Sequence, residues 1–321
     1  MKTLMAVCAI ASAAGFATIA DAQSYPTKPL RFVIPFPPGG GTDTMARIMA
    51  PKLAEALGQQ VVIDNRGGAG ATIGTEIAAK SPPDGYTLLL MTVTNAVGMS
   101  LYPNLKYDLV RDFAPVTRVA TTPHIIVVHT SVPAKTIKEL IALAKARPGA
   151  LVYSSSGSGS VSHLGGEYFA YLTGTRLLHV PYKGGGPSVA ALLSGEVSAA
   201  FATMPSVISH VKSGRVRALA ITTAERSPSL PALGTVIEAG IPNYDVGSWY
   251  GLSVPTGTPK DVIARLGSET IKLLALPDVK QRLDASGFEP ITSTPEQYGE
   301  FVRVEVERWA KVVKMSGAKA D

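Results

Sequence analysis

The stretch that decides the fold is Leu30-Arg-Phe-Val-Ile-Pro-Phe-Pro-Pro-Gly-Gly-Gly-Thr-Asp43. Its apolar first half, residues 30–36, predicts a buried strand, and the prolines and glycines that follow predict a loop. Thr42 or Asp43 is expected to cap a helix, because apolar side chains recur with helical spacing from there to Leu57. A strand that passes through a glycine-rich loop into a helix is typical of an α/β fold.

The same order of elements continues along the chain. A strand at 60–63, a helix at 72–80 and a strand at 86–92 come next, and the pattern begins again near residue 124. A capping box, Thr136-Ile-Lys-Glu139, opens one helix of this second series. Its strands are expected at 124–128, 151–154, 176–180, 199–203 and 217–222. Alternating strands and helices predict mainly parallel sheets with helices on their faces.

Composition narrows the class of protein. The 321 residues suffice for about two domains of roughly 150 residues each. Hydrophobic residues make up 46% and charged residues 17%, which is typical of a globular chain and not of a disordered one. The single Cys excludes an intramolecular disulfide and a Cys-rich metal centre. The net charge is +6, but no two Lys or Arg residues are adjacent, which argues against nucleic acid as a partner.

The N-terminus has the features of an export signal. Lys2 supplies a positive start, a weakly apolar stretch follows from about residue 4 to residue 20, and Ala20-Asp-Ala22 fits a signal-peptidase site. Residues 1–22 are therefore expected to be a signal peptide that is cleaved after Ala22, which places the mature protein in a bacterial periplasm. An uncleaved membrane anchor is the alternative, but the small and polar residues of the stretch favour cleavage.

Three glycine-rich loops follow expected strands and precede expected helices. They span residues 36–43, 155–163 and 182–187. In open α/β sheets ligands bind beyond the carboxyl ends of strands, where free amides at helix starts carry partial positive charge. Each loop alone could be a plain tight turn, but three in one chain favour a site for a small anion.

Signatures of enzymes and metal sites are weak. The first loop lacks the Lys of a phosphate-binding P-loop, and Gly186-Pro-Ser-Val-Ala190 departs from the nucleophile elbow at two positions. A secreted hydrolase that uses Ser188 or a loop serine with His163 stays an alternative. His124 and His129 lie five residues apart on one expected strand and so face opposite sides. No metal and no cofactor are expected, and the chain is expected not to be an enzyme.

Several motifs, in order, resemble one receptor family. They are Pro35-Phe-Pro-Pro-Gly-Gly-Gly-Thr-Asp43, Ser156-Gly-Ser-Gly-Ser-Val-Ser-His-Leu164, His179-Val-Pro-Tyr-Lys-Gly184, Arg217-Ala-Leu-Ala-Ile-Thr222, Trp249-Tyr-Gly-Leu252 and Thr256-Gly-Thr-Pro259. Over essentially the whole mature chain, the sequence is similar to the Bug-type solute-binding receptors of tripartite tricarboxylate transporters. The resemblance implies a two-lobe Venus-flytrap fold in which the chain crosses twice. Lobe 1 would comprise 23–123 plus 224–321, and lobe 2 would comprise 124–223.

The resemblance also implies a function and a set of contacts. A monomeric periplasmic receptor would capture a small carboxylate and deliver it to membrane permease subunits; a sensor that docks a signalling kinase is the alternative, since both roles use the same closed state. The first loop would contribute Phe36, Gly40, Gly41, Thr42 and Asp43, and the second Ser156, Gly157, Ser158 and His163. The third motif would contribute Tyr182 and Lys183. Thr92 and Asn95 are added from their position after the third strand alone.

Overall fold

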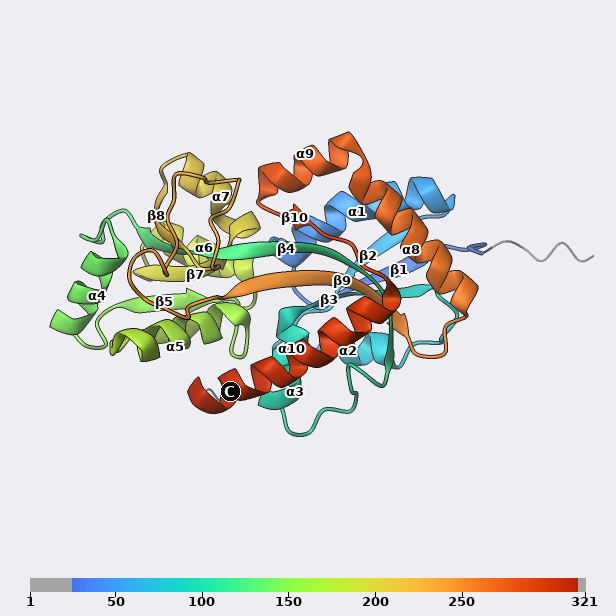
Figure 1. Ribbon diagram of the computed structural model, residues 1–321, viewed down its shortest axis with the longest axis horizontal. Coiled ribbons are helices and arrows are strands. Elements are labelled where there is room, and N and C mark those ends of the chain that lie inside the picture. The colour runs from blue at the N-terminus through green and yellow to red at the C-terminus, as the bar shows by residue number, and fades with distance from the viewer. Residues whose placement is uncertain (1–24, 317–321) are drawn as a thin grey trace, which may run out of the picture.

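Two long strands run through the molecule and join its two lobes (Figure 1). The structure is a computed structural model that describes residues 25–316. Strand β4 (Phe113–His129) pairs antiparallel with β9 (Gly247–Pro255), from Phe113 opposite Pro255 to Pro123 opposite Gly247. Beyond Pro123, β4 continues into the second lobe, where it pairs with β7 and β8. The lobes are therefore joined by hydrogen-bonded strands and not by irregular linkers.

The first lobe is built on a parallel group of strands. Strand β1 pairs in parallel with β2 and β3, and β3 then pairs antiparallel with β9. Helix α1 covers this sheet together with α8 and α9, and their apolar faces bury Met45, Met49, Leu266 and Leu283. The elements of this lobe are β1 (Leu30–Ile34), α1 (Gly41–Leu57), β2 (Val61–Asn65), α2 (Thr72–Ala79), β3 (Thr87–Thr92), α3 (Val93–Leu101), α8 (Lys260–Ala275), α9 (Pro277–Ser286), β10 (Glu289–Pro290) and α10 (Pro295–Ser316).

The second lobe repeats the scheme. Strand β5 pairs in parallel with β6 and β7, and β7 and β8 flank the end of β4. Its elements are α4 (Ile137–Ala146), β5 (Val152–Ser155), α5 (Val161–Thr173), β6 (Leu178–Pro181), α6 (Gly185–Ser194), β7 (Ala199–Thr203), α7 (Met204–Lys212) and β8 (Val216–Ile221). The predicted two-lobe α/β fold is confirmed, with parallel outer strands and antiparallel pairing around β4 and β9.

Several elements differ from the sequence prediction. β4 was expected only over 124–128, and its first eleven residues were missed because Pro115 and Pro123 argue against a strand. The ladder with β9 shifts register between Pro115 and Thr117, and such an irregularity accommodates a proline that cannot donate a hydrogen bond. The sequence prediction also omitted strand β9 and the helices α3, α7 and α9.

The segment between β8 and β9 associates with the second lobe. The Val236 N–H donates to the Ile221 carbonyl, and the Tyr244 hydroxyl donates to the Gly165 carbonyl of α5 at 2.9 Å. The Val246 N–H donates to the carbonyl of Thr222, directly after β8. Residues 235–246 are therefore hydrogen-bonded to β8, to Thr222 and to α5 before the chain enters β9.

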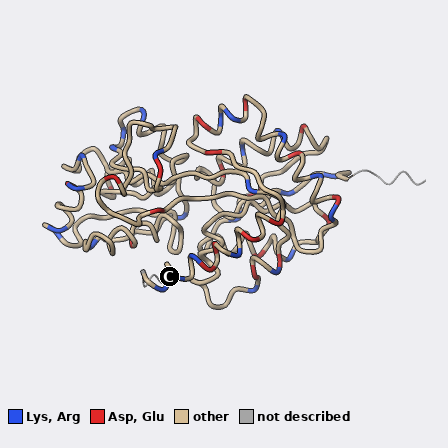
Figure 2. Tube along the Cα trace, in the orientation of Figure 1, with Lys and Arg blue, Asp and Glu red and all other residues tan. Residues whose placement is uncertain are grey.

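Charged residues of both signs are spread over the molecule. Basic and acidic residues are interspersed over the outside of both lobes (Figure 2). Among the described residues, no helix has the length and apolar character that a membrane span requires. The expected signal peptide, residues 1–22, lies outside the described residues.

Candidate functional site

A small cavity lies between the two lobes, at the carboxyl ends of several strands. Its volume is about 40 Å³. One water molecule needs about 10–15 Å³ of cavity volume. The cavity therefore has room for about three waters and is too small for a dicarboxylic acid. We call it the interlobe cavity; it is lined by Phe36, Gly40, Gly41, Thr42, Thr92, Thr94, His124, Ser156, Val161, Ser162, Gly185, Thr203, Ser248 and Tyr250. The lobes are thus closed on each other, and a larger ligand requires them to move apart.

Five helices begin at this cavity. Residues at or next to the N-caps of α1, α3, α5, α6 and α7 all contribute to its lining. The first N–H groups of a helix have no partner within the helix, and they carry the positive end of its dipole. Helices α1 and α3 belong to the first lobe and the other three to the second. The cavity therefore collects positive potential from both lobes, from backbone groups alone.

The first glycine-rich loop shapes the start of α1. The prediction that Thr42 or Asp43 caps this helix is wrong, because α1 begins at Gly41 with Gly40 as its N-cap. Asp43 accepts hydrogen bonds from the Gly39 N–H at 3.0 Å and from the Arg47 guanidinium at 2.8 Å. Burial alone would raise the pKa of Asp43, but these hydrogen bonds outweigh it and lower the pKa. Asp43 thus fastens the loop as a charged carboxylate.

Two glycines lie where the lobes are in contact. A Cβ atom on Gly41 would lie 2.9 Å from the Tyr250 hydroxyl and 3.1 Å from Thr203 Oγ1. A Cβ on Gly184 would lie 2.6 Å from Pro37 Cγ of the opposite lobe. A side chain at Gly184 would collide with the opposite lobe, and one at Gly41 would crowd Tyr250 of its own lobe as well as Thr203 of the other. The glycines therefore permit closure as well as exposing amides.

The start of α3 is held by local hydrogen bonds. Asn95 Oδ1 accepts the Thr92 N–H at 2.7 Å, and Asn95 Nδ2 donates to Thr75 Oγ1 at 2.6 Å. Thr92 and Thr94 line the cavity, whereas the Asn95 side chain is engaged behind the helix start.

The Ser/Gly loop is organised around one serine that sequence reasoning did not select. Ser162 Oγ accepts the Ser156 N–H at 2.9 Å and lies 2.9 Å from the hydroxyls of both Ser156 and Ser160. His163 Nδ1 accepts the Gly159 N–H at 3.1 Å, and its ring stacks on His179 at 4.0 Å. His163 therefore braces the loop from behind.

The third loop presents its backbone and not its charged side chain. Gly185, the first residue of α6, lines the cavity, while Lys183 is exposed. The Tyr182 hydroxyl donates to Glu196 Oε1 at 2.6 Å, and this hydrogen bond raises the pKa of Tyr182 to about 12. Both side chains lie outside the cavity lining.

The predicted site residues divide into two groups. Six line the cavity: Phe36, Gly40, Gly41, Thr42, Thr92 and Ser156. The others lie outside its lining: Asp43, Asn95, Gly157, Ser158, His163, Tyr182 and Lys183. Of this second group, Ser158 belongs to the contact between lobes, since its carbonyl is 3.4 Å from the Tyr102 hydroxyl. Ligand contact by any of these residues stays a prediction.

Strands β4 and β9 add side chains that sequence reasoning missed. His124, Ser248 and Tyr250 line the cavity. Tyr250 is fully buried, which raises its pKa, so its hydroxyl stays protonated. Ser248 and Tyr250 fall in and beside the motif Trp249-Tyr-Gly-Leu252, which was the one signal that could have identified them.

His124 is a neutral imidazole with a defined tautomer. Its Nδ1 is 3.3 Å from the Phe201 carbonyl oxygen, and its Nε2 is 2.8 Å from Ser248 Oγ. Complete burial lowers its pKa to about 4. The carbonyl can only accept, so Nδ1 carries the proton and Nε2 accepts from the Ser248 hydroxyl.

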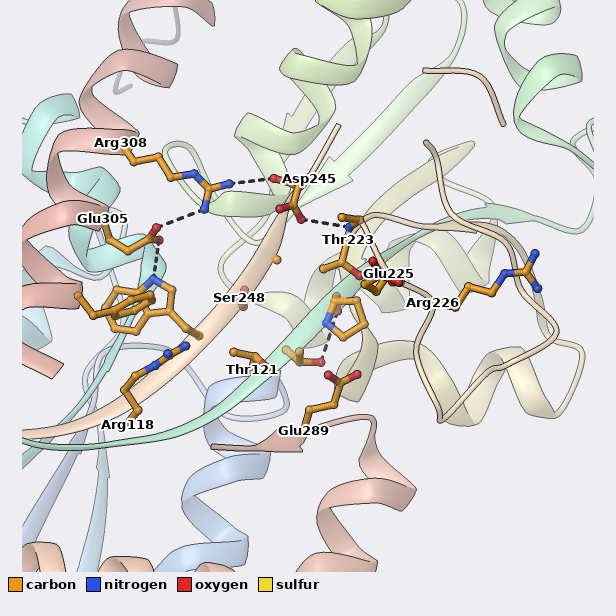
Figure 3. A pocket seen from close by; sticks show the side chains of 16 residues that line it. Arg118, Thr121, Thr223, Glu225, Arg226, Asp245, Ser248, Glu289, Glu305 and Arg308 are labelled. Carbon is orange, nitrogen blue, oxygen red and sulfur yellow. Dashed lines mark hydrogen bonds and ion pairs between the residues drawn. The ribbon is translucent and has the colours of Figure 1, made fainter. Parts of the chain in front are cut away.

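A second, larger cleft lies at the hinge, where β4 and β9 pass between the lobes. Ser248 belongs to both cavities, and the hinge cleft has a volume of about 350 Å³ (Figure 3). Glu305 of α10 accepts from the indole N–H of Trp249 at 2.8 Å and from Trp309 at 3.1 Å. Arg308 pairs with Glu305 and donates to the Asp245 carbonyl at 3.1 Å. Helix α10 thereby ties the returning chain to the first lobe.

Comparison with known proteins gives consistent matches. The family described as "Tripartite tricarboxylate transporter family receptor" matches residues 45–318. Protein BugT of Bordetella pertussis is 41% identical to this chain over 322 residues, covering 99% of each chain.

Solved structures also match most of the chain. An R. palustris protein solved with adipate has a TM-score of 0.89 and 36% identity, covering 92% of this chain and 99% of its own. MatC from Rhodopseudomonas palustris with bound malate has a TM-score of 0.85 and 32% identity, covering 90% of this chain and 100% of its own.

Proposed function

Since this chain belongs to the tripartite tricarboxylate transporter receptor family, as its motifs predicted, we propose that it captures a small carboxylate in the periplasm. It then delivers this ligand to the membrane permease subunits of a transporter, acting as a monomer and without catalysis of its own. The observation that carries the proposal is the convergence of five helix N-termini, from both lobes, on one cavity.

The charge of the lining supports an anion held by neutral donors. Among the described residues, the cavity lining includes no Lys, Arg, Asp or Glu. Each helix start favours an anion by about 0.3–2 kcal/mol, and a micromolar ligand needs about 8 kcal/mol in total. Several helix starts together with the serine and threonine hydroxyls can supply that amount in a closed cavity. A dicarboxylate fits the proposal as well as a monocarboxylate, because donors come from two sides.

Relatives with bound ligands add to this support. The solved relatives hold adipate and malate, both of which are carboxylates. Since the cavity described here holds only about three waters, capture requires an open state that closes around the ligand. A ligand that bridges both lobes stabilises the closed form by binding it more tightly than the open form.

The geometry of Ser188 does not favour the hydrolase alternative. Its hydroxyl donates to Ser154 Oγ at 2.8 Å, and Ser188 is 4% exposed. Ser154 in turn donates to the Ser188 carbonyl at 3.2 Å. The hydroxyl of Ser188 is thus committed inside the second lobe, away from any substrate.

The division of the chain between lobes is also a proposal. The hydrogen bonds of Val236, Tyr244 and Val246 favour a second lobe that continues to about residue 246. The second crossing then lies at the start of β9 and not at residues 223–224, where the sequence alone put it. Protease cleavage of the open form at both crossings would test this division.

Calorimetry of the mature protein tests the proposed function. A panel of mono-, di- and tricarboxylates should include at least one acid that binds, whereas its amide or methyl ester should not. Solution scattering should show a smaller radius of gyration with that acid than without it. Equal affinity for an acid and its amide, or the absence of binding across the panel, would contradict the proposal.

A further inference from the structure

The interlobe cavity is chemically asymmetric. The glycine-rich loops contribute N–H donors at the starts of α1, α5 and α6, whereas α3 and α7 begin at Thr92 and Thr203. On the side of β9 and β7 it presents hydroxyl groups, and the direction of each hydroxyl depends on its neighbours. The partners of Ser248 and Thr203 determine what a ligand would meet there.

Ser248 presents lone pairs and no proton. Its hydroxyl proton is directed to Nε2 of neutral His124 at 2.8 Å, because Nδ1 of that ring donates to the Phe201 carbonyl. A hydroxyl has one proton and two lone pairs, so the remaining capacity of Ser248 is to accept. His124 thus acts as a positioning residue that sets the polarity of Ser248.

Thr203 has the same polarity. Ser206 donates its proton to the Thr203 carbonyl at 2.8 Å, so the 3.0 Å contact between the two hydroxyls is filled by the Thr203 proton. Oγ1 of Thr203, a residue of the cavity lining, is therefore also left with lone pairs and no proton to offer. A carboxylate oxygen placed against Ser248 and Thr203 would meet lone pairs, and that arrangement is repulsive.

A ligand that fits this side must carry a donor, and the donor should be uncharged. An ammonium group would be buried without a counter-charge from the protein, since no Asp or Glu of the described chain lines the cavity. A hydroxyl group donates one hydrogen bond and adds no charge. It can also accept from the Tyr250 hydroxyl, because Tyr250 belongs to the same cavity lining.

We propose that the cavity selects carboxylates that carry a hydroxyl group, with Ser248 Oγ, oriented by His124, as the acceptor of the ligand hydroxyl proton. This inference rests on the proposed function, because the glycine-rich loops bind the carboxylate. Ser248 then accepts a hydrogen bond from the hydroxyl substituent of the ligand. It names the ligand class as hydroxycarboxylates, in preference to unsubstituted dicarboxylates and to amino acids.

Matched pairs of acids test this selection by calorimetry on the mature protein. Succinate is compared with each enantiomer of malate, and glutarate with 3-hydroxyglutarate; aspartate provides the charged donor. At least one hydroxyl acid should bind ten or more times as tightly as its unsubstituted partner and more tightly than aspartate. Equal or tighter binding of the unsubstituted acids would overturn the selection while leaving carboxylate capture intact. Failure of every carboxylate in the wider panel would overturn both.

Variants assign the selection to Ser248. In Ser248→Ala the ratio between hydroxyl and unsubstituted acids should fall to near one, with little change for the unsubstituted acids. Ser248→Cys keeps a side chain of similar size but replaces the hydroxyl by a weak acceptor. If the alanine variant folds poorly, the same fall in the ratio is expected in this cysteine variant. His124→Asn should reduce the same ratio.

The matched control is Ser162→Ala, which removes a cavity hydroxyl on the side of the loops. It should weaken both members of a pair by the same factor and leave the ratio intact. A ratio that survives in both Ser248 variants would overturn the role of Ser248.

Discussion

Replacing Gly41 by alanine tests whether closure of the lobes limits ligand affinity. The substitution retains the backbone N–H at the first position of α1 and is compatible with helical geometry. The new methyl group would lie 2.9 Å from the Tyr250 hydroxyl and 3.1 Å from Thr203 Oγ1. Both distances are shorter than the 3.4 Å at which ordinary contact begins. One side chain or one lobe must therefore move by a few tenths of an ångström.

The expected magnitude follows from where the two contacts lie. Overpacking by one methyl group costs about 1–3 kcal/mol. Tyr250 belongs to the same lobe as Gly41, so its share of the cost is present in the open and closed states alike. Thr203 belongs to the opposite lobe, and its share is present only on closure. If each contact accounts for about half, closure loses about 0.5–1.5 kcal/mol, and affinity falls about two- to twelvefold.

Calorimetry with an acid identified in the panel measures this loss, and thermal unfolding of the ligand-free protein measures the share due to Tyr250. Gly40→Ala is the matched control, because its Cβ would lie 3.6 Å from the Gly185 N atom, at an ordinary contact distance. In a Thr203→Ala background, Gly41→Ala should cost less affinity than in the parent. Parental affinity in Gly41→Ala, or an equal loss in Gly40→Ala, would refute the reasoning.

Further predictions concern stability and processing. Because burial lowers the pKa of His124 to about 4 while the unfolded chain keeps about 6.5, the unfolded state binds the proton first. The free energy of unfolding should therefore fall by about 3 kcal/mol between pH 6.5 and pH 4, and urea titrations of His124→Asn should lack this component. Glu305→Ala leaves two buried indole N–H groups without their acceptor and should cost about 2–4 kcal/mol in chemical unfolding, whereas Glu305→Gln should cost less. Mass spectrometry of a periplasmic extract should find a mature chain that begins at Gln23, and an intact Met1 would contradict the export signal.

The elements that could be predicted from sequence carry their own start and stop signals. Thr136 accepts the Glu139 N–H at the start of α4, as the capping box predicted, and Gly58 ends α1 with a φ of 68°. Helix α3 follows β3 without a turn, and its capping pair has Asn95 where the usual capping box has Glu or Gln, so the change at Val93 was missed. The first half of β4 and all of β9 are stabilised by each other across more than a hundred residues of chain, and local patterns do not report such pairing.

The candidate site shows the same division. The glycine-rich loops could be used to predict where backbone amides converge. A glycine, a turn and a helix start lie next to one another in the sequence, so their combination is visible there. Asn95, His163 and Tyr182 have the right chemistry for contact but are engaged by nearby groups, and only the fold shows this. The pair formed by His124 and Ser248 joins positions that are 124 residues apart, so no motif could have brought them together.

The pairing of Pro123 with Gly247 across the hinge has a consequence for how such receptors diversify. In the division proposed above, the segment from 124 to 246 leaves the first lobe and returns to it at adjacent positions of one ladder. An exchange of this segment between relatives therefore needs only two junctions, and the flanking strands are expected to keep their register. A chimaera made in this way would inherit His124, Thr203 and the Ser/Gly loop from one parent and Ser248 and the start of α1 from the other. The ligand contacts from the segment 124–246 and those from the rest of the chain could then evolve, or be engineered, separately.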